Sequence, residues 1–420
     1  MKKIILIILL CIFITGCKFY DEYEMPEEVS IKINDKKFEV YTSHKLEEII
    51  DDTNAEILNS DKSLKTEKTG KNKVTIEYRY KKRDYKYDVK YEVTDTEKPT
   101  LLDMPDYFSI DVGEEINQDK MCEKTEYIDN YDKEVTCNIN GDYDINTPGT
   151  YYLKYEIKDS SGNIGESDLT LYVNSNDEDE DEDYDYYEED YNDYEYDDDE
   201  DEEDNYYYPG YIDFNDVLKA HKNENTMIGL DISKWQGDVD FNAIKKAGAE
   251  FVILRMAVSM GVDDKIGLDG YFEQNLKNAK KAGLKVGVYV YTAASSEKEI
   301  TSQAKYIKKH LNKVKLDFPV AYDFENWWEI KDLKVSKHDL IHYVDIFSEI
   351  LAEDGYEVMI YGSKYYLEKV WGKTKYPTWL AHYVDETGYE GDYIMWQMCS
   401  DGRIDGIYGD VDIDIYYKKD

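Results

Sequence analysis

The stretch from Asp177 to Asp204 constrains the fold most, because it cannot contribute to a hydrophobic core. Of its 28 residues, 21 are Asp or Glu, the rest are Tyr or Asn, and none is aliphatic or basic. Such a composition favours an extended, solvated chain. We therefore predict a disordered linker over residues 174–226, which separates a C-terminal domain from N-terminal modules. A plain spacer is the simplest interpretation; weak calcium binding and repulsion from anionic polymers are alternatives.

The linker also accounts for much of the charge of the chain. The formal net charge over 420 residues is -42, and the 21 acidic residues of this stretch carry half of it. So negative a chain is a poor partner for nucleic acid, whose phosphates would repel it. The modules on either side of the linker are only moderately acidic.

Residues 1–17 have the pattern of a secretory signal. A basic start, Met1-Lys2-Lys3, precedes an apolar run from Ile4 to Ile14 that is too short to span a bilayer. The ending Ile14-Thr15-Gly16-Cys17 resembles a bacterial lipobox, which implies that Cys17 carries a lipid anchor. We therefore expect an extracytoplasmic protein that is anchored to the bacterial cell membrane and faces the cell wall. The alternative is an ordinary cleaved signal with an incidental Cys.

Residues 30–95 predict a small domain of mixed or mainly β structure. Polar and apolar residues alternate over 74–80 and 85–91, which is typical of half-buried antiparallel strands. We expect a helix over residues 45–58. No chemical constellation stands out in this segment.

Residues 96–173 resemble the Ig-like β-sandwich modules of bacterial surface proteins. The resemblance rests on the run from Gly149 to Asn163, with Tyr151, Tyr155, Asp159 and Gly162 in the positions of the last hairpin. Such modules are usually spacers, so the resemblance concerns fold rather than function. Two Cys in this segment, Cys122 and Cys137, would face an oxidising space, where a disulfide between them is plausible. Cys399 is expected to be a buried apolar residue.

Residues 227–420 change to an alternation of strand-like and helix-like runs, the signature of parallel βαβ units. The expected strands are 228–232, 251–256, 285–291, 319–325, 357–361, 378–383, 393–398 and 411–415. The expected helices are 241–247, 271–282, 297–311 and 336–353. Gaps of about ten residues between the last strands leave no room for crossover helices. The fold class is therefore multidomain: mainly β N-terminal modules, and a C-terminal α/β trimmed (β/α) barrel that lacks its late helices.

Polar residues stand at the ends of the expected barrel strands, where the catalytic residues of such barrels lie. They are Asp231, Arg255, Tyr289, Tyr291, Asp323, Glu325, Tyr361 and Asp412. Residues i and i+2 of a strand share a face, so Asp323 and Glu325 would project together. Paired carboxylates assist the cleavage of glycosidic bonds, and aromatic rings suit the apolar faces of sugars.

Four ordered motifs resemble the glycoside hydrolase family 25 muramidases, the Chalaropsis-type lysozymes. The first is the opening run Asp231-Ile232-Ser233-Lys234-Trp235-Gln236-Gly237, and the second is Asp323-Phe324-Glu325. The third is Trp379-Leu380-Ala381-His382-Tyr383, and the fourth combines Trp396-Gln397, Ile404-Asp405-Gly406 and Val411-Asp412. The resemblance covers nearly all of residues 227–420. It departs from the family at Asp414, where Asn is usual.

The resemblance implies a glycosidase, a lysozyme (N-acetylmuramidase), that needs no cofactor or metal. Its substrate would be the glycan strands of peptidoglycan, cleaved at the β-1,4 bond between N-acetylmuramic acid and N-acetylglucosamine. Glu325 would be the general acid; Asp323 would orient the acetamido group or stabilise positive charge, and Asp231 and Asp412 would shape the site. The candidate sugar-binding residues are Trp235, Tyr291, Tyr361, Trp379, Trp396 and Gln397.

Each of these assignments has a structural alternative. Asp231 with Ser233 would suit a cap on the following turn, Asp412 would suit a solvated strand, and any single aromatic would suit the core. The alternative for the whole chain is a non-catalytic surface lipoprotein that binds the cell wall. Binding alone would not require the pair Asp323 and Glu325.

Overall fold

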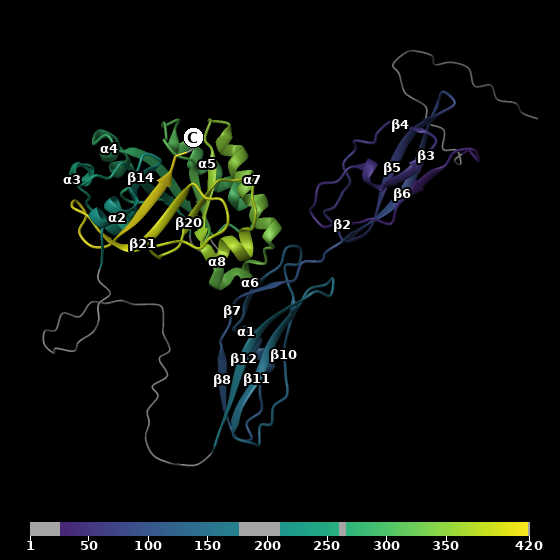
Figure 1. The fold of residues 1–420 in the computed structure, drawn as a ribbon, viewed down its shortest axis with the longest axis horizontal. Coiled ribbons are helices and arrows are strands. Elements are labelled where there is room, and N and C mark those ends of the chain that lie inside the picture. Colours follow the sequence, from purple (N-terminus) through teal and green to yellow (C-terminus); the bar gives the residue numbers. More distant parts are fainter. Residues whose placement is uncertain (1–25, 176–210, 260–265, 419–420) are drawn as a thin grey trace, which may run out of the picture. The chain divides into compact units, whose positions relative to one another are not determined.

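The structure is a computed structural model that describes residues 26–175, 211–259 and 266–418 (Figure 1). The chain divides between Glu97 and Lys98 into two compact units. Cys17, the rest of the predicted signal and the acidic part of the predicted linker lie outside the described residues. Within the described part, no helix has the length and apolarity needed to cross a membrane.

The first unit is built on one long hairpin. Strands β5 (Gly70–Tyr80) and β6 (Arg83–Thr94) pair antiparallel along their whole length, and alternate residues such as Val74 and Ile76 are buried on one face. Shorter strands extend the unit: β1 (Ile31–Ile33), β2 (Lys37–Glu39), β3 (Ile50–Thr53) and β4 (Glu56–Ile57). Together β2, β6, β5 and β4 form a four-stranded sheet, and β1 pairs with β3.

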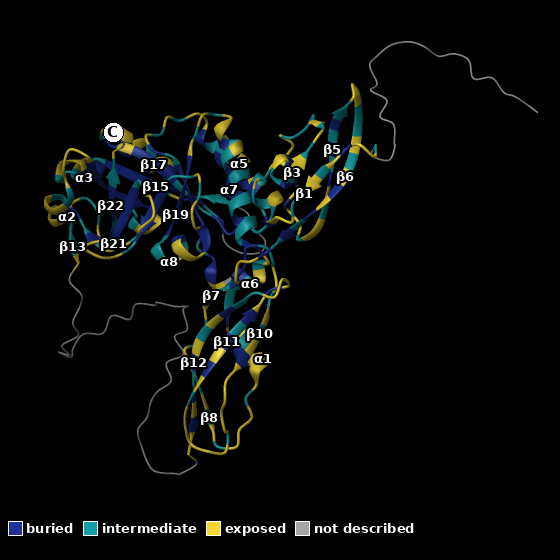
Figure 2. Ribbon diagram, turned by 45° about the vertical axis from the view of Figure 1, so that its right-hand side comes forward, coloured by how far each residue is buried: buried dark blue, intermediate teal, exposed yellow. Residues whose placement is uncertain are grey.

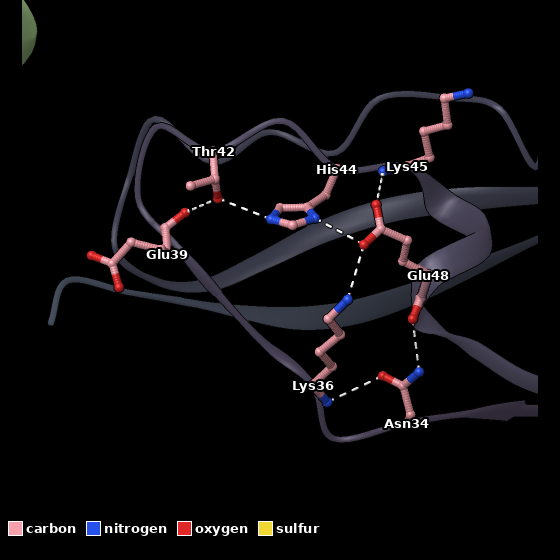
Figure 3. Close-up of polar contacts among 7 residues, drawn as sticks. All are labelled: Asn34, Lys36, Glu39, Thr42, His44, Lys45 and Glu48. Atoms are coloured by element: carbon pink, nitrogen blue, oxygen red, sulfur yellow. Dashed lines mark hydrogen bonds and ion pairs between the residues drawn. The ribbon is translucent and has the colours of Figure 1, made fainter. Parts of the chain in front are cut away.

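The helix expected over residues 45–58 is wrong. Only a single 3-10 turn, η1 (Leu46–Ile49), forms before the chain becomes β3. Figure 3 shows how this turn is held: the Glu48 carboxylate accepts hydrogen bonds from the backbone N–H of Lys45, from Lys36 Nζ and from His44. These bonds lower the pKa of Glu48 to about 2, the one from the backbone of Lys45 having the largest effect. The turn does not continue as a helix because the residues that follow it pair with β1. The single turn already buries Leu46 and Ile49, whose spacing had suggested a longer helix.

The second unit begins with residues 98–174, here called the β module. Its sheets are β10-β11-β12-β8 and β7-β9, and a disulfide joins Cys122 in α1 to Cys137 in β10. The Ig-like assignment of this module stays a prediction. The elements are β7 (Thr100–Asp103), β8 (Tyr107–Asp111), α1 (Gln118–Glu123), β9 (Glu126–Ile128), β10 (Thr136–Asn140), β11 (Gly149–Lys158) and β12 (Ile164–Asn174).

A barrel-like sheet forms the C-terminal part, as the sequence predicted. Its strands follow the order β14-β15-β17-β18-β19-β20-β21-β22, and β22 returns to pair with β14. They are β14 (Thr226–Ile232), β15 (Phe251–Val258), β17 (Lys285–Tyr291), β18 (Val320–Asp323), β19 (Val358–Ser363), β20 (Thr378–Ala381), β21 (Met395–Arg403) and β22 (Val411–Tyr417). Among these eight strands all pairings are parallel except those of β22, which runs antiparallel to both of its neighbours. Figure 2 shows how deeply these strands are buried.

Helices cover the first part of the barrel and are scarce after β20. The long ones are α3 (Phe241–Ala247), α4 (Phe272–Lys281), α5 (Glu297–Leu311) and α7 (Lys337–Ala352). Short pieces that the sequence did not predict are β16 (Gly267–Leu268), η2 (Lys234–Gln236), η3 (Trp327–Glu329), α6 (Ile330–Leu333), α8 (Lys364–Tyr366) and η4 (Leu367–Trp371). They follow the barrel strands, so they lie at the end where the candidate site is.

The predicted linker ends earlier than expected. Residues 212–221, assigned to it from composition, form β13 (Ile212–Asp213) and α2 (Phe214–His221). Strand β13 pairs in parallel with β21, and Asp213 caps α2 by accepting a hydrogen bond from Asn215 N. Phe214 and Val217 are buried against the barrel. The acidic and polar neighbours of these apolar residues concealed their helical spacing.

Candidate active site

Four acidic side chains line one pocket of about 330 Å³ at the mouth of the barrel. Asp231 comes from β14, Asp323 ends β18, Glu325 follows it, and Asp412 comes from β22. Because β22 is antiparallel, its first residues lie at the same end as the last residues of the parallel strands, and Asp412 pairs directly with Asp231. The structure therefore brings together the acids that the sequence singled out.

Burial governs the charge state of this cluster. It raises the pKa of Glu325 to about 7, and it raises the pKa of Asp412 to about 7 as well. For Asp323, burial and then the nearby Glu325 raise the pKa well above its usual range, against an opposing effect of Arg255. Burial, then Asp412 and Asp414, act in the same direction on Asp231. At neutral pH such a cluster retains protons that isolated carboxyls would have lost.

Gln397 connects one acid to two tyrosines. Its Nε2 donates a hydrogen bond of 2.7 Å to Asp231, and its Oε1 accepts bonds from the hydroxyls of Tyr361 (2.8 Å) and Tyr383 (3.0 Å). The amide is therefore held in one orientation by three partners. This network fixes the orientation of Asp231 and of the two tyrosines that line the pocket with Glu325.

Arg255 supplies the positive charge of the pocket. Its Nε donates to Asp269 Oδ2 at 2.8 Å, and the same oxygen accepts the backbone N–H of Lys234 at 3.0 Å. Asp269 was not predicted, because it lies in a connection between β15 and α4 where a lone Asp carries no pattern. It holds Arg255 where the guanidinium lowers the pKa of Asp323.

The predicted sugar-binding residues divide into two groups. Trp235, Tyr291, Tyr361, Trp379 and Gln397 all line the pocket. Trp235 is 75% exposed, and the Lys234 ammonium lies 4.5 Å from the centre of its ring, so at most one face of the ring is open to a sugar. Trp379 is almost fully buried and packs against Tyr289 and Tyr361, so it forms the floor.

Trp396 does not belong to the pocket. Neighbouring residues of a strand point to opposite faces, and Gln397 of β21 faces the mouth, so Trp396 faces the other way. Its indole is 3% exposed, donates a hydrogen bond to the carbonyl of His382 and contacts His221 edge-on. Trp396 is a core residue, and the sequence prediction for it is wrong.

Asp414 is a buried acid beside the site that the sequence marked only as a departure from a family pattern. It lies on the same face of β22 as Asp412, is fully buried, and accepts a hydrogen bond of 2.9 Å from Trp379 Nε1. Burial and the nearby Asp412 raise its pKa well above the usual range. The sequence could have indicated Asp414, because it lies two residues after Asp412 in a strand and such residues face the same side.

A second hollow, of about 400 Å³, adjoins the first. Glu325, Tyr361 and Tyr383 line both, so Glu325 lies where the two meet. The remaining wall of the second hollow is Ser363, Lys364, Tyr365, Glu368, Ala381 and His382. Three of these residues, Lys364, Tyr365 and Glu368, come from the segment after β19, which the sequence did not connect with the site.

A barrel mouth that gathers buried carboxyls and aromatic rings has the equipment of a glycosidase. The comparisons with known proteins agree with this class. Residues 230–407 match the family model of the glycosyl hydrolases family 25. Over these residues the C-terminal part of the chain is therefore similar to the family 25 glycosyl hydrolases.

Curated relatives match the same region. The chain is 31% identical over 191 residues to an autolytic lysozyme of Clostridium acetobutylicum, and this match covers 45% of the chain but only 55% of that lysozyme. It is 26% identical over 199 residues to lysozyme M1 of Streptomyces globisporus, with 44% and 65% covered. A family 25 glycosyl hydrolase from Bacillus anthracis has a similar structure, with a TM-score of 0.42, 21% identity, and 48% and 93% coverage.

Proposed function

We propose that the chain is a peptidoglycan hydrolase that cleaves the β-1,4 bond between N-acetylmuramic acid and N-acetylglucosamine. One observation carries the proposal: Glu325, whose pKa is raised to about 7 by burial, lies between two hollows. A bond that passes from one hollow to the other would lie beside the carboxyl. A carboxyl that is protonated near neutral pH is equipped to donate its proton to the leaving oxygen.

Asp323 acts next to this proton donor. Its carboxyl is buried at the end of β18, and Arg255 counteracts the rise in its pKa. Asp323 would orient the substrate's acetamido group or, in the ionised form that Arg255 favours, stabilise positive charge at the anomeric carbon. Asp231 and Asp412 shape the pocket around the sugar, and Gln397 holds Asp231 in place.

We also propose that the chain is anchored through a lipid on Cys17, outside the cytoplasm and facing the cell wall. This follows from the lipobox-like ending of the leader alone. An anchored hydrolase would meet glycan strands within reach of its linker. The alternative is a non-catalytic protein that binds the cell wall. In the described part of the structure, every contact that fits this alternative also fits a hydrolase.

The test is to incubate the full chain with purified peptidoglycan and identify the sugars at the new reducing ends. We expect N-acetylmuramic acid ends, and a loss of activity of about 10²–10⁴-fold in Glu325→Gln with binding retained. Ends of N-acetylglucosamine would make the chain a glucosaminidase, and released peptides alone would make it an amidase or peptidase. Binding without turnover by the unaltered chain would support the wall-binding alternative.

A further inference from the structure

The β module contacts the barrel at the two segments that border Glu325. One is residues 327–337, which follows β18, and the other is residues 363–366, which follows β19. Strands β18 and β19 are parallel neighbours, so both segments emerge at the mouth of the barrel. Figures 1 and 2 both show β7 of the module beside α6.

The first segment is held by backbone and side-chain bonds from the module. The Lys331 backbone N–H donates to Glu126 Oε2 at 2.9 Å, and its Nζ donates to the carbonyls of Glu123 and Thr125, each at 2.8 Å. Further along, the Lys337 backbone N–H donates to the carbonyl of Asp129 at 2.7 Å. These bonds fix the chain from α6 to the start of α7.

The second segment is held through one tyrosine. The hydroxyl of Tyr365 donates to the carbonyl of Leu101 in β7 at 3.3 Å. The side chain of Tyr365 also lines the second hollow, together with its neighbour Lys364. The module therefore bonds directly to a residue of the wall that faces Glu325.

Apolar packing joins the module and both segments into one body. Ile128 and Leu102 of the module are buried in the same cluster as Trp327 and Ile330. Trp327 in turn stacks on Tyr366 with ring centroids 4.2 Å apart, which connects the first segment to the second. This is core packing, unlike the few polar contacts that a flexible spacer would make.

We propose that the β module is a positioning element of the candidate active site. By holding residues 327–337 and 363–366, it shapes the second hollow to receive the leaving-group side of a glycan strand. The identity of this ligand rests on the proposed function, whereas the positioning itself does not.

Hydrogen exchange in the full chain tests the positioning without reference to activity. We expect the double variant Glu126→Ala and Lys331→Ala to speed amide exchange about tenfold in residues 327–337, because it removes bonds that close this segment. Tyr365→Phe, which removes only a hydroxyl, should act in the same way on residues 363–371. The control is Lys154→Ala, whose ion pair with Glu166 lies within the module. Exchange that matches this control in both segments would overturn the proposal.

Substrate dependence gives the second readout. In the double variant, kcat/KM for glycan strands should fall about tenfold, while kcat/KM for a glycoside with an aryl leaving group changes much less. An equal fall for both substrates would indicate general damage and contradict the positioning role. If the unaltered chain cleaves neither substrate, the proposed function fails, and the exchange experiment still decides whether the module positions these segments.

Discussion

Glu325 is partly buried and Asp414 is fully buried, and their surroundings give these two acids different roles. Glu325 borders two hollows and has a pKa raised to about 7, so its proton can reach a bound substrate. Asp414 does not line either hollow, and it accepts a hydrogen bond from the indole of Trp379. Under the proposed function the first residue donates a proton, whereas the second supports the floor of the pocket.

Asp414→Asn should stabilise the protein increasingly as pH rises. The pKa of Asp414 is raised in the folded state, so the folded protein retains a proton that the unfolded chain loses near pH 3.9. Above that pH the carboxyl therefore lowers the free energy of unfolding. This loss grows with pH until the pH exceeds the pKa that Asp414 has in the folded protein. Asn keeps an acceptor for Trp379 without this penalty. Thermal unfolding should show similar stability for both proteins at pH 4 and a more stable variant at pH 7.

The opposite pattern would contradict this account of Asp414. A variant that is destabilised at both pH values would mean that the charge itself is needed, and a constant gain would mean that titration is not the cause. Activity on peptidoglycan should be largely retained in Asp414→Asn. The variant tests a supporting residue and leaves the four acids that line the pocket intact.

At the scale of elements, the regular β/α alternation was predictable and the short connecting pieces were not. Hydrophobic periodicity located the barrel strands from β14 to β22 and the long helices, because each buries a continuous apolar face. It also placed Asp231, Asp323, Glu325 and Asp412 at one mouth. Periodicity cannot locate pieces of three to five residues, so α8 and the wall of the second hollow were missed.

Two errors arose where local composition conflicted with tertiary packing. Residues 212–221 were assigned to the linker because of the acidic chain before them, yet Phe214 packs on the barrel. Trp396 was assigned to sugar binding because it lies in a motif, although its neighbour Gln397 takes the inward face of β21. In both places, contacts distant in sequence decided the outcome.

Phe214→Ala should destabilise the unit formed by residues 98–420. The ring is fully buried in α2, and its removal would leave a cavity that costs about 3–5 kcal/mol. Lys219→Ala is the matched control in the same helix, since its exposed ion pair with Asp216 contributes little. Denaturant unfolding of the full chain would check this. A Phe214→Ala protein within about 0.5 kcal/mol of the unaltered chain would show that α2 is dispensable.

At the scale of the whole molecule, the β module is not attached to the barrel as a loose spacer. Its Ile128 shares a buried cluster with Trp327, two residues after Glu325. Activity of the C-terminal part is therefore expected to depend on residues 98–174. Experiments on this protein are best made with the full chain, because a start at Met227 would remove both α2 and the module.

Cys17→Ser should release the protein from membranes. The proposed lipid would be joined to this thiol, and serine cannot replace it in that linkage. In a bacterium that processes lipoproteins, the unaltered chain should partition with the membrane fraction and the variant should not. Cys11→Ser, in the apolar run of the same leader, is the control and should stay with the membranes. Equal partitioning of all three proteins would rule out the anchor.

The pH dependence of kcat/KM on peptidoglycan tests the central claim most directly. If Glu325 donates its proton with a pKa of about 7, the rate should be nearly constant just below pH 6 and fall about tenfold per unit well above pH 7. The fall follows from deprotonation of the free enzyme. Two results would contradict the claim that Glu325 is the proton donor. One is a kcat/KM that does not decrease between pH 6 and pH 9, and the other is a kcat/KM that already decreases as the pH rises past about 4.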